Sequence, residues 1–154
     1  MVPKHDSRVI LVEDYISRAN FNAPLREYYS GKNILVTGGA GAIGSNLIVA
    51  LSLLVGNKGK VIILDNLSSS KTAATWNITP LSNILFVEGD IRSDIDLKRV
   101  FKEGIDLVYH LAAFFANQNS VDYPEVSAEV DVIGQIKLLE YSRLAKVERF
   151  IYAS

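Results

Sequence analysis

The sequence has no cysteine, no surplus of charge of one sign and no apolar run long enough to cross a membrane. The lack of cysteine excludes disulfides, thiolate metal sites and a cysteine nucleophile, and no other metal site is predicted. The 16 basic and 17 acidic residues leave a formal net charge of -1, so neither nucleic acid nor a membrane is an expected partner. The first residues resemble no targeting signal, and the cytoplasm is the expected compartment.

The chain has 154 residues, 49% of them hydrophobic, which is enough for one buried core. From Lys32 onward, short β-branched runs alternate with helix-like segments, a pattern typical of a parallel sheet. Each run is nearly all apolar, as expected of strands buried on both faces. The expected strands are 33–37, 60–64, 83–87, 107–110 and 149–153.

Helices are predicted over 42–55, 94–102 and 125–146. The last has an apolar face made of Val130, Ile133, Ile136, Leu138, Leu139 and Leu144. Because crossovers between parallel strands are right-handed, the expected strand order is 3-2-1-4-5. The fold class is therefore α/β, a Rossmann-like doubly wound parallel sheet that stops before a sixth strand and a substrate domain.

Two segments fall outside this alternation. Residues 1–31 form an amino-terminal extension to the domain over 32–154; Val9 to Ile16 fits a short amphipathic helix, and Pro24 interrupts whatever follows. The loop from Leu67 to Pro80 holds the only tryptophan, Trp76. Two interpretations stay open for that loop: it reaches toward a ligand, or its tryptophan anchors it to the surface.

A glycine loop lies between the first expected strand and the first expected helix. Gly39, Gly41 and Gly44 fit G-x-G-x-x-G, and Gly38, Gly41 and Gly44 fit the related T-G-x-x-G-x-x-G. In this context, unpaired amides and the positive end of the helix dipole converge where a pyrophosphate can bind. The loop therefore predicts a dinucleotide site.

Asp65 follows the second strand, close to the position about 20 residues on where an acidic side chain binds the adenosine ribose. A carboxylate there repels a 2′-phosphate, and no arginine lies nearby to bind one, so NAD is favoured over NADP. The alternative is a glycine-rich turn with an unrelated surface aspartate.

Two more segments follow directly after expected strands, at the carboxyl edge of the sheet, where open parallel sheets bind ligands. Asp90 and Ile91 are placed to contact adenine, and the small residues after His110 let a cofactor lie close to the backbone. Both segments could equally be simple strand ends. His110 itself has apolar neighbours and is interpreted as a packed histidine rather than an acid or base.

Together these residues resemble the extended short-chain dehydrogenase/reductase family, in particular its NAD-dependent nucleotide-sugar epimerases and dehydratases. The resemblance covers Gly31 to Ser154 and rests on five segments in order: Ile34 to Ser45, Asp65 to Ser68, Gly89 to Ile91, His110 to Ala113 and Phe150 to Ser154.

The resemblance implies NAD as cofactor, a nucleotide sugar as substrate of the complete protein, and transient oxidation of a sugar carbon as the chemistry. It implies phosphate binding by the glycine loop, ribose contacts from the segment after Asp65, adenine contacts from Asp90 and Ile91, and a backbone wall from the segment after His110. The residues so assigned are Gly38, Gly41, Ala42, Ile43, Gly44, Asp65, Asn66, Leu67, Ser68, Ser69, Ser70, Asp90, Ile91, Leu111, Ala112 and Ala113. It also implies a homodimer through the long helix.

The family's catalytic Y-x-x-x-K motif falls beyond the fifth strand and is not in this sequence, so the chain alone is expected to be inactive. Ser154 is the one candidate for the hydroxyl that positions substrate. Asp131 stands where the family commonly has asparagine, and Phe115 where some sugar epimerases have lysine. These departures make the substrate assignment less definite.

Two other functions remain open on the sequence. The chain could be a non-catalytic module that senses a dinucleotide or acts as a scaffold. It could also belong to a hydroxysteroid-type dehydrogenase or reductase, because those members of the family share the same amino-terminal motifs.

Overall fold

The computed structural model describes residues 7–18, 23–69, 81–114 and 117–153. Its centre is a parallel sheet of five strands in the order β3-β2-β1-β4-β5. The predicted class and strand order are confirmed, and the predicted strands differ from the observed ones only at their ends. The strands are β1 (Asn33–Thr37), β2 (Lys60–Asp65), β3 (Ile84–Glu88), β4 (Leu107–His110) and β5 (Arg149–Tyr152).

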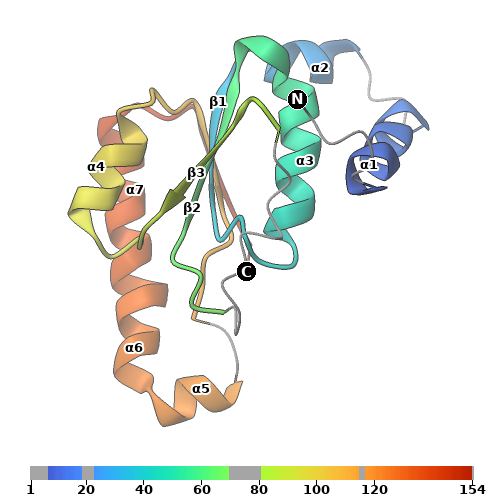
Figure 1. Cartoon of the computed structure of the whole chain (residues 1–154). Coiled ribbons are helices and arrows are strands. Elements are labelled where there is room, and N and C mark those ends of the chain that lie inside the picture. The colour runs from blue at the N-terminus through green and yellow to red at the C-terminus, as the bar shows by residue number, and fades with distance from the viewer. Residues whose placement is uncertain (1–6, 19–22, 70–80, 115–116, 154) are drawn as a thin grey trace.

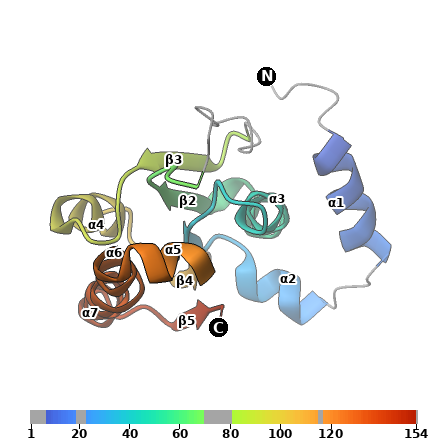
Figure 2. The ribbon, with the colours of Figure 1, turned by 90° about the horizontal axis from the view of Figure 1, so that it is seen from below.

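Helices cover both faces of the sheet (Figures 1 and 2). One side carries α3 (Gly44–Val55), with α2 (Ala23–Tyr29) and α1 (Ser7–Arg18) beside it. The other side carries α4 (Asp94–Phe101) and α7 (Gln135–Leu144). Four short elements complete the described part: η1 (Gly56–Lys58), α5 (Asn117–Asp122), α6 (Pro124–Ala128) and η3 (Glu129–Gly134).

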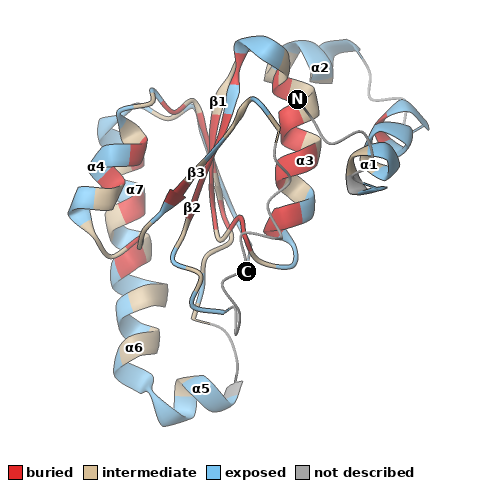
Figure 3. Ribbon diagram, viewed as in Figure 1, coloured by how far each residue is buried: buried red, intermediate tan, exposed pale blue. Residues whose placement is uncertain are grey.

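The three inner strands form the core, but the two outer strands do not. Residues 34–36 of β1 and 61–63 of β2 are fully buried, because helices pack on both faces there. Along β3 and β5 most residues stay partly or fully exposed, as the colours along β3 show (Figure 3). Tyr152 at the end of β5 is 58% exposed. The expectation of uniformly buried strands was therefore wrong at the two edges, where no further strand among the described residues covers them.

The helix predicted over 125–146 is not one regular α-helix. Between α6 and α7 the backbone forms a π-helix, η3 (Glu129–Gly134), and α7 ends before Lys146, which has a φ of 56°. The predicted apolar face also divides. Leu138 is fully buried, whereas Ile136 is 57% exposed. Four other apolar side chains of this segment are also exposed: Val132, Ile133, Leu139 and Leu144.

The amino-terminal segment is helical and packs on the core. The helix expected over Val9 to Ile16 is present and longer, and Ile16 is buried. Pro24 lies in the first turn of α2, where its missing N–H costs nothing, so it begins a helix rather than interrupting one. The hydroxyls of Tyr29 and Tyr109 are 2.6 Å apart, which joins α2 to β4. The domain boundary at residue 31 stays a prediction.

Candidate nucleotide-binding site

A cavity of about 800 Å³ lies at the carboxyl ends of the strands. The register brings these ends together, because Thr37 at the end of β1 pairs with Leu64 of β2 and with His110 of β4. The glycine loop, the turn after β2, the turn after β3 and the segment after β4 all contribute to the wall. The lining residues are Gly38, Ala40, Gly41, Ala42, Ile43, Gly44, Leu64, Asp65, Asn66, Ser68, Ser69, Gly89, Asp90, Ile91, Leu111, Ala112, Ala113, Phe114, Val130 and Ala153.

Two glycines of the loop have no room for a side chain. Gly38 has a φ of 71°, and a Cβ atom there would lie 2.7 Å from the nitrogen of Ala112. A Cβ atom at Gly44 would meet the carbonyl oxygen of Gly38 and lie 2.6 Å from the Cα of Gly39. Glycine at these positions lets the loop approach the segment after β4 and fold onto the first turn of α3.

The loop leaves backbone donors unpaired beside the cavity. Gly41 N–H donates to the carbonyl of Gly38 (3.2 Å), and Ser45 N–H donates to that of Gly41 (2.9 Å). Between them, the amides of Ala42 and Ile43 have no acceptor among the described residues. No side chain caps the start of α3 either. The unpaired amides and the helix dipole together favour an anion at this place.

Asp65 is fixed by both carboxylate oxygens at the end of β2. Oδ2 accepts a hydrogen bond from the amide of Ala40 (2.9 Å), and Oδ1 accepts one from the amide of Leu67 (2.8 Å). The first bond ties the carboxylate directly to the glycine loop. The two elements that the sequence pairs in a dinucleotide motif are thus in contact.

Asp90 carries a permanent negative charge. Arg92 binds both of its carboxylate oxygens, with Nε at 3.0 Å and Nη2 at 2.8 Å, and the amide of Asn66 donates to the same carboxylate (2.9 Å). These bonds hold the pKa of Asp90 down at about 2, and the hydrogen bond from Arg92 is the largest cause.

A buried pair joins the ends of β1 and β4 behind the cavity. Thr37 Oγ1 lies 2.7 Å from Nδ1 of His110, and the amide of Ala112 points at the same hydroxyl from 3.4 Å. A hydroxyl that accepts from Ala112 can donate to Nδ1, which favours a neutral imidazole with its proton on Nε2. Burial lowers the pKa of His110 from 6.5, and the charge of Asp131 opposes this. His110 is packed, as its apolar sequence neighbours indicated.

Asp131 in η3 holds the segment after β4. Its Oδ1 accepts a hydrogen bond from the amide of Phe114 (2.8 Å) and its Oδ2 one from the hydroxyl of Ser127 (3.0 Å). An asparagine could accept only on its single carbonyl oxygen, so the aspartate fits two donors that face it from two directions.

The cavity brings together most of the predicted binding residues. Leu67 does not line it, although its amide binds Asp65. Ser70 and Ser154, like Trp76 and Phe115, lie outside the described residues. Six lining residues were not predicted: Ala40, Leu64, Gly89, Phe114, Val130 and Ala153. Four of them are direct neighbours of predicted ones, whereas Val130 comes from η3, and nothing in the helical pattern indicated a π-helix.

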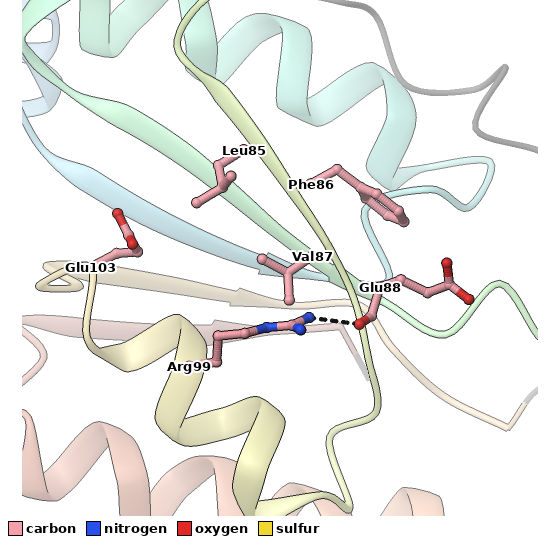
Figure 4. A pocket seen from close by; sticks show the side chains of 6 residues that line it. All are labelled: Leu85, Phe86, Val87, Glu88, Arg99 and Glu103. Atoms are coloured by element: carbon pink, nitrogen blue, oxygen red, sulfur yellow. Dashed lines mark hydrogen bonds between the residues drawn. The ribbon is translucent and has the colours of Figure 1, made fainter.

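A second hollow, of about 500 Å³, lies on the outer edge of β3 (Figure 4). Arg99 of α4 donates to the backbone carbonyl of Glu88 there (2.7 Å), so one of its donors is engaged within the fold. Glu88 and Glu103 add negative charge to the lining. This hollow is therefore a poor place for a phosphate.

The described residues hold no group of three or more histidine, cysteine, aspartate or glutamate side chains that could bind a metal ion. Among the same residues, no helix is long and apolar enough to span a membrane.

Residues 34–154 match the model of the NAD dependent epimerase/dehydratase family. The chain belongs to this family. The matched range holds the sheet from the second residue of β1 onward and every residue that lines the cavity.

Similar proteins and solved structures are epimerases, in agreement with the family match. The chain is 41% identical over 122 residues to a putative UDP-glucose 4-epimerase of Methanocaldococcus jannaschii, covering 79% of this chain and 37% of that protein. Its structure is similar to that of an epimerase from Methanothermobacter thermautotrophicus, with a TM-score of 0.78, 55% identity, and coverage of 85% of this chain and 37% of that one. It is also similar to UDP-glucose 4-epimerase of Thermus thermophilus in complex with NAD, with a TM-score of 0.66, 36% identity, and coverage of 79% and 37%.

The chain thus spans a little over a third of the length of these relatives. It corresponds to their amino-terminal part. The predicted family is confirmed, and so is the prediction that the chain matches only the amino-terminal, cofactor-binding part of its members.

Proposed function

We propose that this chain binds NAD in the cavity at the carboxyl ends of the strands, and that it is the cofactor-binding part of a nucleotide-sugar epimerase or dehydratase. The observation that carries the proposal is the pair of unpaired amides of Ala42 and Ile43 at the start of α3. The space that a side chain at Gly38 would fill supports the same conclusion, because the loop needs it for close approach.

Each part of the dinucleotide can be assigned to its own group of residues in the cavity wall. The amides of Ala42 and Ile43 would bind the pyrophosphate, and Asp65 with the serines after it would surround the adenosine ribose. Ile91 would lie against adenine, and the small residues from Leu111 to Ala113 would line the centre of the cofactor.

Asp65 also supports a preference for NAD over NADP. Its carboxylate is fixed against the glycine loop, so it cannot swing away from a 2′-phosphate without losing the hydrogen bonds from Ala40 and Leu67. A second negative charge at the ribose is therefore opposed by a charge that is held in place.

Bound NAD would supply the hydride acceptor for a transient oxidation. The lining of the cavity offers no tyrosine, lysine or histidine among the described residues that could take the hydroxyl proton. We therefore expect cofactor binding without turnover from this chain, and activity only from a longer protein that supplies the proton-handling groups.

Calorimetric titration of the purified chain with NAD and with NADP tests this function. We expect saturable binding of NAD, weaker binding of NADP and, when a UDP-sugar is added with NAD, no product. Binding of neither dinucleotide would overturn the proposed cofactor role, and product formation would overturn the assignment of the chain as a binding part only.

We also propose that the complete protein is a homodimer that uses the exposed stripe of η3 and α7. Val132, Ile136 and Leu139 lie about one helical turn apart and all face away from the core. An apolar stripe of this kind favours association. Size-exclusion chromatography of the wild type and of Ile136→Lys tests it: the wild type should elute as a larger species, and identical monomeric elution of both would contradict it.

A further inference from the structure

The cavity has two halves, one on each side of β1, and only one of them has charged side chains in its wall. The strand order places Asp65 and Asp90 on the side of β2 and β3, and the segments after β4 and β5 on the other side. The described residues that line this second half are uncharged: Leu111, Ala112, Ala113, Phe114 and Ala153. A dinucleotide with its pyrophosphate at the glycine loop and its adenosine ribose at Asp65 extends its nicotinamide into the second half.

A carboxylate lies directly behind the wall of the second half. Asp131 of η3 accepts a hydrogen bond from the backbone amide of Phe114 at 2.8 Å, so it is bonded to the wall itself. Its other oxygen accepts a hydrogen bond from the hydroxyl of Ser127 (3.0 Å). Both donors are neutral, and no lysine or arginine among the described residues forms a salt bridge with Asp131. Within the described part of the chain, no paired cation neutralises this carboxylate.

The charge of Asp131 acts on a group at the end of β4. Burial lowers the pKa of the His110 imidazole, and the charge of Asp131 opposes that lowering. Because His110 is buried behind the same wall, little water separates the two groups, and the interaction between them is weakly screened. A positive charge that enters the second half of the cavity is exposed to the same carboxylate.

The hydrogen bonds of Asp131 do not by themselves require an aspartate. An asparagine could accept from the amide of Phe114 on its oxygen and donate its own N–H to the hydroxyl oxygen of Ser127. The main difference between the two residues at this position is therefore the charge. An asparagine would hold the wall in place without placing a negative charge behind it.

We propose that Asp131 makes the cofactor site favour oxidised NAD over NADH. The oxidised nicotinamide ring carries a positive charge and the reduced ring is neutral, so a carboxylate behind the wall stabilises the oxidised form selectively. Both forms carry the same phosphate charges, and the amides of the glycine loop do not distinguish them. In a complete protein, this preference favours return of the hydride to the oxidised sugar. The inference rests on the proposed binding of NAD in the same cavity.

The test is calorimetric titration of the wild type and of Asp131→Asn with three ligands: oxidised NAD, NADH and ADP-ribose, which has no nicotinamide. We expect Asp131→Asn to weaken oxidised NAD by about tenfold, the scale of one charge interaction near a protein surface, and to leave the other two within about threefold. A tenfold change raises the potential of the bound couple by about 30 mV.

Two control variants separate charge from shape and position from net charge. Ser127→Ala removes a hydrogen bond to Asp131 but keeps its charge. Glu103→Gln removes an equal charge beside Lys60, at the amino ends of the strands. Both variants should keep the wild-type ratio of oxidised NAD to NADH affinity. If either changes that ratio as much as Asp131→Asn does, wall shape or net charge explains the effect and the inference is overturned.

The remaining outcomes distinguish this inference from the proposed function. If the wild type binds oxidised NAD, and Asp131→Asn changes the ratio to NADH by less than about threefold, the inference alone is overturned. An equal weakening of ADP-ribose and oxidised NAD overturns it too, because the nicotinamide is then not what Asp131 acts on. If the wild type binds neither dinucleotide, the proposed function is overturned, and this inference with it.

Discussion

The two ends of the sheet use their polar groups in opposite ways. At the amino ends of the strands, the carboxylate of Asp106 accepts a hydrogen bond from the backbone amide of Asn33 (2.7 Å), and Lys32 forms a salt bridge with Glu148 (2.8 Å). At the carboxyl ends, the amides of Ala42 and Ile43, directly before α3, have no acceptor among the described residues.

The two sets of polar groups therefore serve different purposes: those at the amino ends stabilise the fold, and those at the carboxyl ends are available to a ligand. Donors and acceptors that satisfy each other contribute to folding and have nothing left for a ligand, whereas donors left open at a helix start are prepared for an anion. Substitutions at the amino end should therefore change the free energy of unfolding and spare NAD affinity. Substitutions at the carboxyl end should lower NAD affinity.

The largest expected effect is that of Gly38→Ala at the carboxyl end. The new Cβ would lie 2.7 Å from the nitrogen of Ala112, so the loop must move away from the segment after β4. We expect NAD affinity in calorimetry to fall at least about 100-fold, equivalent to about 3 kcal/mol.

Gly104→Ala is the matched control for that substitution. Its φ of 72° imposes the same backbone strain, but the nearest atom to a new Cβ is 4.0 Å away. Gly104→Ala should lose stability through backbone strain alone and keep its NAD affinity, whereas Gly38→Ala should lose more stability, because of the overlap, and also lose NAD affinity. Equal losses of affinity in the two would mean that backbone strain, and not the closed space at the loop, explains the effect.

Asp106→Ala should give the opposite pattern. It leaves the amide of Asn33 without its acceptor, so the free energy of unfolding in urea should fall by about 1–3 kcal/mol while NAD affinity stays unchanged. Asp106→Asn, which keeps one acceptor oxygen, should recover part of that stability. A large loss of NAD affinity in Asp106→Ala would break the separation of the two ends.

Asp65→Asn should change selectivity more than stability. The amide retains one acceptor oxygen and removes the charge that faces a 2′-phosphate. We expect the ratio of NAD to NADP affinity to fall by about tenfold, measured by parallel titrations. An unchanged ratio would show that Asp65 does not set the preference.

The smallest effect is a pH dependence from His110. Burial lowers its pKa below 6.5 in the folded chain, so the unfolded chain binds more protons, and stability should fall as the pH drops below 6.5. The slope should stay below about 1.4 kcal/mol per pH unit, the limit for one proton. His110→Asn should remove this slope; a slope that survives in His110→Asn belongs to other groups.

The sequence predicted the sheet well because its signals are local. The apolar runs of β1 and β2 and the glycine loop are each patterns of neighbouring residues, and right-handed crossovers leave few ways to arrange the strands. The binding segments follow from the same rule, since parallel strands end at one edge.

The remaining features depend on contacts between segments that are distant in the sequence. Nothing local in residues 129–134 indicates a π-helix, and its close approach to the turn after β3 needs Gly134 to lie against Ile91. The saturation of Asp90 by Arg92 depends on side-chain placement rather than on spacing. The exposure of β5 depends on what packs beside it.

The central claim, that the open amides at the carboxyl end bind NAD, is tested most directly by amide NMR spectra of the wild-type chain during titration with NAD. We expect the resonances of Ala42 and Ile43 to shift most, and those of Asn33 and Glu148 at the amino end to stay in place. Saturable shifts confined to Leu85 through Glu88 at the β3 edge, or no shift at Ala42 and Ile43, would contradict the claim.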